Sequence, residues 1–161
     1  MRLCIKQKVF SWVDRFNIMD EAGRDKYYVK GEMFSWGKKL HIYNLAGNEV
    51  AFIQQKIFSF LPKYYVYMNG SQVAEIVKEF TFLRPRYSIS GLGWKIDGEF
   101  WAHDYSITQG DRQIVIIQKQ WFTWGDCYTV DIENQSDEIL GMAVVLTIDC
   151  VMAAASSASS N

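Results

Sequence analysis

Apolar and polar residues alternate over short stretches along most of the chain. Phe16-Asn17-Ile18 and Leu40-His41-Ile42 are two examples of this two-residue period. Successive side chains of a β-strand point to opposite faces, so the alternation predicts strands that bury one face. Glycine-containing segments, such as residues 45–48 and 68–71, separate these stretches and predict turns. Most of the chain is therefore expected to form short strands.

The same pattern recurs in six related units. They begin at residues 5, 29, 53, 77, 96 and 117. The first three intervals are each 24 residues long, and the first copy reads Ile5-Lys6-Gln7-Lys8-Val9-Phe10-Ser11-Trp12. A repeat of this kind sets the architecture, because each unit adds the same supersecondary element. Each unit reads as two strands, which predicts about twelve strands in a sandwich or a barrel.

The pattern changes after Ser136, where a long apolar stretch begins. Apolar residues from 139 to 155 fall on every side of the predicted helix, and Asp149 interrupts them. Such a helix is buried inside a protein or spans a membrane, and this one is at the short limit for spanning. We expect a helix at about residues 137–155 threaded through the β-structure, with a C-terminal membrane anchor as the alternative. Residues 156–161 are expected to form a flexible Ser-rich tail.

Together these features resemble the LURP-one-related (YxjI-like) family. The resemblance rests on the Lys/Gln-x-x-Phe-Ser-Trp units, above all residues 5–12, followed by one apolar C-terminal helix, and covers about residues 3–155. The family belongs to the tubby C-terminal-domain-like superfamily, which also includes phospholipid scramblases. It implies a mostly β fold: a closed antiparallel twelve-stranded barrel around one central helix, in a single domain over residues 1–155. Tubby domains bind phosphoinositide head groups, whereas members like this chain mostly lack an assigned activity.

Composition limits the partners and the compartment. Lys plus Arg number 17 and Asp plus Glu number 18, so the net charge of −1 argues against a nucleic-acid-binding protein. Cys4, Cys127 and Cys150 are widely spaced and suit reduced thiols rather than a disulfide framework. The N-terminus has no apolar segment of the signal-peptide type. We expect a cytoplasmic protein.

The sequence contains no recognised catalytic or metal-binding motif. His41 and His103 are its two histidines, and neither lies in a metal-ligand spacing. His103 beside Asp104 could be a base with an orienting acid, but an exposed turn pair is the commoner arrangement. Asp149 could handle a proton, but we expect a buried, hydrogen-bonded carboxylate with a structural role. The prediction is a protein that is not an enzyme and needs no metal or cofactor.

Charge is unevenly distributed between the two sets of turns. If each unit is a hairpin, the turns within units gather at one rim, where six cations face three acids for a net charge of +3. Those cations are Arg15, Lys38, Lys39, Lys63, Arg84 and Arg86. The opposite rim holds four cations and ten acids, a net charge of −6.

The basic rim also carries aromatic residues, which are Trp12, Trp36, Phe60 and Trp124. Cations combined with Trp suit an anionic membrane surface, whereas aromatic residues can also simply close the end of a barrel. The sequence thus favours a non-catalytic module that binds anionic phospholipid head groups at the basic rim, peripheral to a membrane. The alternative is a protein-interaction or structural module.

Overall fold

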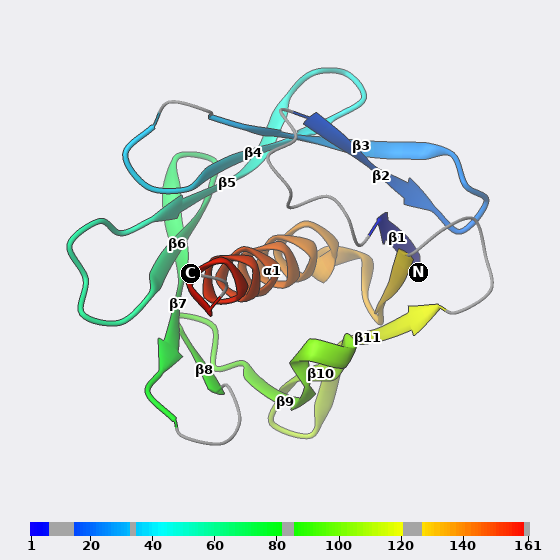
Figure 1. Ribbon diagram of the computed structural model, residues 1–161. Coiled ribbons are helices and arrows are strands. Elements are labelled where there is room, and N and C mark those ends of the chain that lie inside the picture. The colour runs from blue at the N-terminus through cyan, green and yellow to red at the C-terminus, as the bar shows by residue number, and fades with distance from the viewer. Residues whose placement is uncertain (7–14, 33–34, 82–85, 121–126, 160–161) are drawn as a thin grey trace.

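The computed structural model describes residues 1–6, 15–32, 35–81, 86–120 and 127–159 (Figure 1). Its strands are β1 (Arg2–Lys6), β2 (Arg15–Asp20), β3 (Asp25–Gly31), β4 (Lys39–Asn44), β5 (Glu49–Gln55), β6 (Lys63–Met68), β7 (Ser71–Glu79), β8 (Arg86–Ser90), β9 (Lys95–Glu99), β10 (Asp104–Gln109), β11 (Arg112–Gln120) and β12 (Cys127–Ile132). Its helices are the short 3-10 helices η2 (Phe100–Ala102) and η3 (Gln135–Asp137) and the α-helix α1 (Glu138–Ser159).

The strands form a nearly closed antiparallel barrel. Consecutive strands pair along the chain, except β8 with β9, and β1 joins the two halves by pairing with β12, where Leu3 lies opposite Val130. The hydrogen-bonded order therefore starts at β8, passes through β1 and β12, and ends at β9. The predicted fold class, a mostly β twelve-stranded barrel around a helix, is confirmed (Figure 1).

The inward-facing side chains of the strands, at every second position, form the core. Ile18, Ile42, Ile53 and Ile76 point inward from four strands and are fully buried. Register shifts recur near the ends of β2, β4, β6 and β10, next to the turns that follow. Such irregularities bend a strand and increase its twist, which helps a meander of short strands curl into a barrel.

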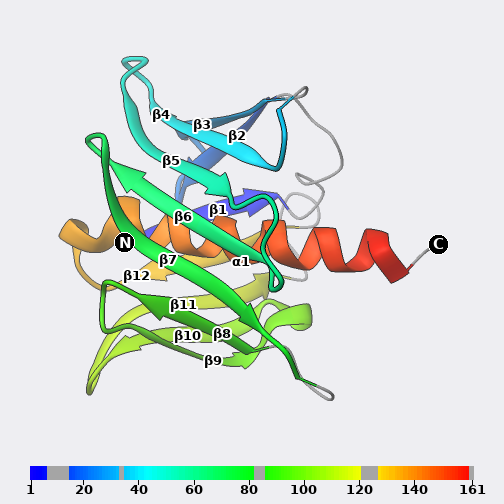
Figure 2. The same cartoon turned by 90° about the vertical axis from the view of Figure 1, so that its left-hand side faces the viewer.

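Helix α1 fills the barrel along its axis (Figure 2). The side chains of residues 142–146 are completely inaccessible to water, so the all-round apolar pattern reflects burial inside the barrel. The helix begins one residue after the predicted start and continues to Ser159, four residues past the predicted end. Within the described part of the chain, no helix combines the length and apolarity that crossing a membrane requires.

The antiparallel order places alternate loops at the same end of the barrel. Odd-numbered strands end, and even-numbered strands begin, at the end where the C-terminus of α1 projects (Figure 2). We call the described loops at this end, residues 35–38, 56–62, 80–81 and 100–103, the C-rim. The turns 45–48 and 69–70 lie at the opposite rim.

Candidate functional site at the C-rim

Exposed large apolar side chains gather at the C-rim. They are Trp36, Ile57, Phe58, Phe60, Phe80 and Trp101. Among the described residues, Met1 and Leu45 are the other large apolar side chains with high exposure, and both lie at the opposite rim. Apolar residues scattered singly over a surface need no explanation, but a concentration at one end marks an interaction surface.

The two most exposed aromatic side chains lie in the loop between β5 and β6. Phe58 is 92% exposed and Phe60 is 98% exposed. Phe58 also has a positive φ of 57°, a left-handed conformation that is strained for a bulky residue. Burial of the ring does not offset this strain, because the ring lies in water. Strain of this kind is often kept where a residue has a function.

Hydrogen bonds hold the C-rim loops side by side. The Gln55 N–H donates to the Lys38 carbonyl at 2.8 Å, and the Lys38 N–H donates to Gln55 Oε1 at 2.9 Å. The Lys78 N–H donates to the Pro62 carbonyl at 2.9 Å, which joins the next loop to the end of β7. Adjoining loops that are joined by hydrogen bonds thus carry Trp36, Phe58 and Phe60.

A glycine makes the contact between the first two loops possible. Gly37 has a φ of 80°, and a Cβ added there would lie 3.3 Å from Ile57 Cγ2 and from the Gln55 carbonyl oxygen. A larger residue would strain the backbone and push the loops apart. This close approach keeps Trp36, which is 78% exposed, beside the loop that carries Phe58.

Two of the predicted site cations are held by carboxylates on the outer wall. Lys39 Nζ lies 2.9 Å from Glu32 Oε2, and Lys63 Nζ lies 2.9 Å from Glu75 Oε1. The hydrogen bond to Glu75 raises the pKa of Lys63. Both lysines begin strands at the C-rim, but their charges are neutralised locally rather than presented beyond the loops.

The other predicted cations do not converge on one pocket. The guanidinium of Arg15 lies over the ring of Tyr28, 4.1 Å from its centroid, on the outer wall. Lys38 is half-buried in its loop, and Arg86 is exposed at the start of β8. Arg84 lies outside the described residues. The structure therefore spreads the basic side chains around the C-rim.

Sequence reasoning missed the first part of the loop between β5 and β6, residues 56–58. Lys56 is exposed and its N–H donates to the Lys63 carbonyl at 2.8 Å, so it belongs to the loop that carries Phe58. It was missed because β5 ends at Gln55, earlier than the repeat indicates, which adds residues 56–58 to the loop. The predicted aromatic residues Trp12 and Trp124 lie outside the described residues.

A second surface feature follows the outer wall of β3 to β6. Six side chains form a continuous ladder with ring centroids 4.6–6.4 Å apart. In order, they are Tyr28, Tyr43, His41, Phe52, Tyr67 and Tyr65. His41 also links two carboxylates, with Nδ1 2.7 Å from Glu49 and Nε2 2.9 Å from Glu32. Cross-strand ring pairs of this kind stabilise a sheet.

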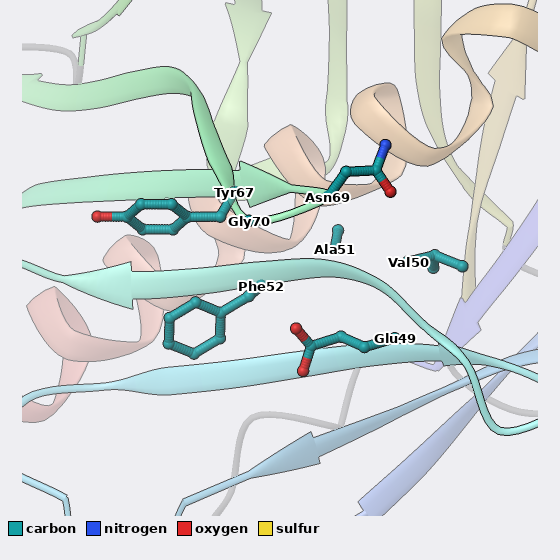
Figure 3. A pocket seen from close by; sticks show the side chains of 7 residues that line it. All are labelled: Glu49, Val50, Ala51, Phe52, Tyr67, Asn69 and Gly70. Atoms are coloured by element: carbon teal, nitrogen blue, oxygen red, sulfur yellow. The ribbon is translucent and has the colours of Figure 1, made fainter.

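A shallow hollow of about 260 Å³ adjoins the ladder (Figure 3). Phe52 and Tyr67 supply ring surface, while Glu49 and Asn69 supply polar groups. One carboxylate oxygen of Glu49 lies 2.7 Å from His41 Nδ1 and therefore already has a partner. The hollow has the mixed lining of a small binding surface, but it lies toward the rim opposite the exposed aromatic loops.

The interior contains a histidine–aspartate pair that the sequence did not reveal. His103 was expected in an exposed pair with Asp104, but it is buried, and its Nε2 lies 3.3 Å from Asp149 Oδ1. The Tyr128 phenol donates to the other oxygen of Asp149. Asp149 is 3% exposed, so the prediction of a buried, hydrogen-bonded carboxylate is confirmed. Burial raises its pKa, while His103 and Tyr128 lower it to a smaller extent.

A barrel filled by its own C-terminal helix, with its exposed apolar side chains concentrated at one rim, defines a tubby-like binding or structural module. The family model for LURP-one-related proteins matches residues 1–149, so the chain belongs to this family, as its repeated units indicated.

Two known proteins agree with this assignment. The chain is 35% identical over 152 residues to the uncharacterized protein YxjI of Bacillus subtilis (strain 168). This alignment covers 94% of this chain and 94% of that protein. It also resembles the X-ray structure of a protein from Arabidopsis thaliana, with a TM-score of 0.63 over 92% of this chain and 89% of that one. The second match has 13% sequence identity and therefore supports the fold alone. Neither description indicates a catalytic family.

Proposed function

We propose that the protein is a non-catalytic module that docks reversibly on a phospholipid bilayer through the C-rim, with anionic head groups strengthening the contact. The observation that carries this proposal is the exposure of Trp36, Phe58 and Phe60 on adjoining loops. Aromatic side chains favour the membrane interface, where one part of the ring system is in an apolar layer and the rest is in a polar one. The proposed location is the cytoplasmic surface of a membrane.

The expected affinity is modest. Full burial of a large apolar side chain contributes about 1.5–3 kcal/mol, so three half-inserted rings contribute about 3 kcal/mol. Lys38, Lys56 and Arg86 add roughly 1 kcal/mol each near an anionic surface. A total of about 6 kcal/mol corresponds to a dissociation constant between about 1 mM and about 1 μM. Such binding is peripheral and reversible.

The form of the C-rim suits a fluid partner. Phe58 and Phe60 protrude almost completely into water instead of lining a concave surface. A tight protein interface packs as densely as a protein interior, which needs a complementary surface, whereas a bilayer accommodates separate protrusions. The engaged lysines Lys39 and Lys63 contribute little charge, so the apolar contact supplies about half of the proposed interaction and the remaining cations supply the other half.

Vesicle co-sedimentation tests this proposal. The Phe58→Ser/Phe60→Ser double variant should lose about tenfold or more in binding to vesicles that contain anionic lipid. Leu45→Ser is the matched control, because Leu45 is 65% exposed but lies at the opposite rim. Equal binding by the double variant and the parent protein would exclude the C-rim as the docking surface.

A charge-reversal pair separates the electrostatic contribution. Lys38→Glu/Lys56→Glu should weaken binding to anionic vesicles at low salt, and added salt should reduce the difference because it screens exposed charges. Lys95→Glu, at the opposite rim, should have no effect. Binding that ignores the double reversal would show that anionic head groups play no part.

The outer-wall ladder favours docking of a protein partner as the second candidate function. Tyr and other aromatic residues are enriched in protein interfaces, and Tyr43, Phe52 and Tyr67 form one continuous surface. Hydroxyl-radical footprinting distinguishes the two candidates. A partner on the outer wall should protect Tyr43 and Tyr67 in cell extract relative to purified protein, while bilayer docking should protect Phe58 and Phe60.

A further inference from the structure

The barrel has one seam without a hydrogen-bonded ladder among its described strands, between β8 and β9. These strands lie next to each other and are consecutive along the chain. They are nevertheless the two ends of the hydrogen-bonded order, in which every other neighbouring pair has an antiparallel register. Side chains rather than a backbone ladder must therefore hold this seam.

Helix η2 bridges the seam at the C-rim. Its first residue, Phe100, packs against Tyr87 of β8 with ring centroids 4.7 Å apart and against Tyr105 of β10 at 5.1 Å. The helix ends at Ala102, and the next residue, His103, has a left-handed φ of 51° and donates its N–H to the Phe100 carbonyl at 3.0 Å. This turn directs the His103 side chain into the barrel.

His103 connects η2 to the central helix. Its ring stacks on Tyr128 with centroids 4.5 Å apart, and its Nε2 lies 3.3 Å from Asp149 Oδ1. The side chain of His103 is 11% exposed and that of Asp149 is 2% exposed. The contact therefore ties the segment that follows η2 to the central helix α1 in the buried interior.

The surroundings make His103 the group that can compensate the charge of Asp149. The other titratable groups around this carboxylate are Tyr87 from β8, Tyr105 from β10, Tyr128 from β12 and the adjoining Cys150 of α1. Burial raises the pKa of each of these groups, so they remain neutral. A buried carboxylate that loses its partner is strongly destabilised, and hydration relieves it.

We propose that His103 acts as a latch: by partnering the buried carboxylate of Asp149 it keeps the β8–β9 seam closed at the C-rim, and an ionised Asp149 without this partner drives the seam open. Opening at the seam lets water reach the carboxylate without breaking a ladder between strands. The same motion frees η2, which carries the half-exposed Trp101 on the C-rim. This latch does not depend on lipid docking and can be tested without lipid.

Hydrogen exchange on the full-length protein tests the latch. His103→Gln should accelerate exchange in β8, β9 and η2 by at least about tenfold and leave β4 and β5 unchanged, because only the seam opens. Asp149→Asn should not accelerate hydrogen exchange at the seam, since the asparagine amide oxygen can still accept the Tyr128 hydrogen bond and carries no charge. In the Asp149→Asn background, His103→Gln should lose its effect.

Three results would overturn the proposal. The first is equal acceleration of β4 and β5 by His103→Gln, which indicates general destabilisation. The second is an undiminished effect of His103→Gln in the Asp149→Asn background, and the third is faster seam exchange in Asp149→Asn alone. If His103→Gln does not fold, the double variant decides: His103→Gln/Asp149→Asn that folds with parental seam exchange supports the latch, and a double variant that also fails to fold overturns it.

The pH dependence provides a second readout. Burial raises the pKa of Asp149, so the closed seam binds a proton more tightly than the open seam, and falling pH favours closure. After correction for intrinsic exchange, opening in the parent protein should slow as the pH falls from neutral, and Asp149→Asn should lack this slowing. Faster opening of the parent seam as the pH falls would contradict the latch.

Discussion

Replacement of Lys26 by methionine tests how the start of α1 is attached to the barrel. Lys26 Nζ, from β3, lies 2.6 Å from Glu138 Oε1, and Glu138 is the first residue of α1. The side chain of Glu138 is 6% exposed and that of Lys26 is 32% exposed. Methionine keeps the apolar stem of the lysine but removes its charge, so Glu138 is left buried without its cation.

The size of the effect follows from this partial exposure. Removing one partner of a fully buried pair costs about 3–5 kcal/mol. Water near the Lys26 ammonium screens part of that interaction, and the helix N-terminus still stabilises Glu138 by about 0.3–1 kcal/mol. The Tyr27 phenol, whose pKa is raised by burial and by Glu138, also remains beside this carboxylate. We therefore expect Lys26→Met to lower the free energy of unfolding by about 2 kcal/mol.

Urea unfolding followed by tryptophan fluorescence measures this loss, which corresponds to about 4–8 °C in Tm. Lys95→Met is the control, because Lys95 is exposed and should change stability by less than about 0.5 kcal/mol. A double-mutant cycle with Glu138→Gln should give a coupling energy of about 1–2 kcal/mol. A loss no larger than that of the control, or a coupling energy of zero, would refute the attachment of α1 through this pair.

Two further predictions concern packing and backbone. Leu146→Ala should lower the free energy of unfolding by about 2–5 kcal/mol in urea, because Leu146 is fully buried on the helix and its loss leaves a cavity; a loss below about 1 kcal/mol would contradict the packed core. In thermal unfolding, Gly98→Ala should be much more destabilising than Gly110→Ala. A Cβ added at Gly98 would lie 2.5 Å from the Asp104 carbonyl oxygen, whereas a Cβ added at Gly110 would meet no atom within 4 Å. Similar Tm values for these two variants would show that the backbone at Gly98 relaxes freely.

Much of the fold could be read from short stretches of the chain. The alternation around Ile18 and Ile42 identifies strands with one buried face, because the period of two depends on adjacent residues alone. The apolar residues around Leu146 identify a buried helix for the same reason. Closure of the ring, in which β1 meets β12, came from the family resemblance rather than from periodicity.

The candidate site was only partly accessible from the sequence. The division of turns between two rims follows from consecutive hairpins, and it correctly places Trp36 and Phe60 at one rim. The sequence does not show that Lys63 pairs with Glu75 or that Lys39 pairs with Glu32, because both pairs depend on side-chain placement across strands. The number of free cations was therefore overestimated.

What the sequence by itself determined is the set of elements: strands with one buried face, turns between them and an all-apolar final helix. These follow from interactions between residues a few positions apart. Only the tertiary structure decided which distant groups meet, such as His103 with Asp149 and Lys26 with Glu138. The physical reason is that strand register, barrel closure and the position of α1 are set by the packing of the whole core, so no local pattern encodes these contacts.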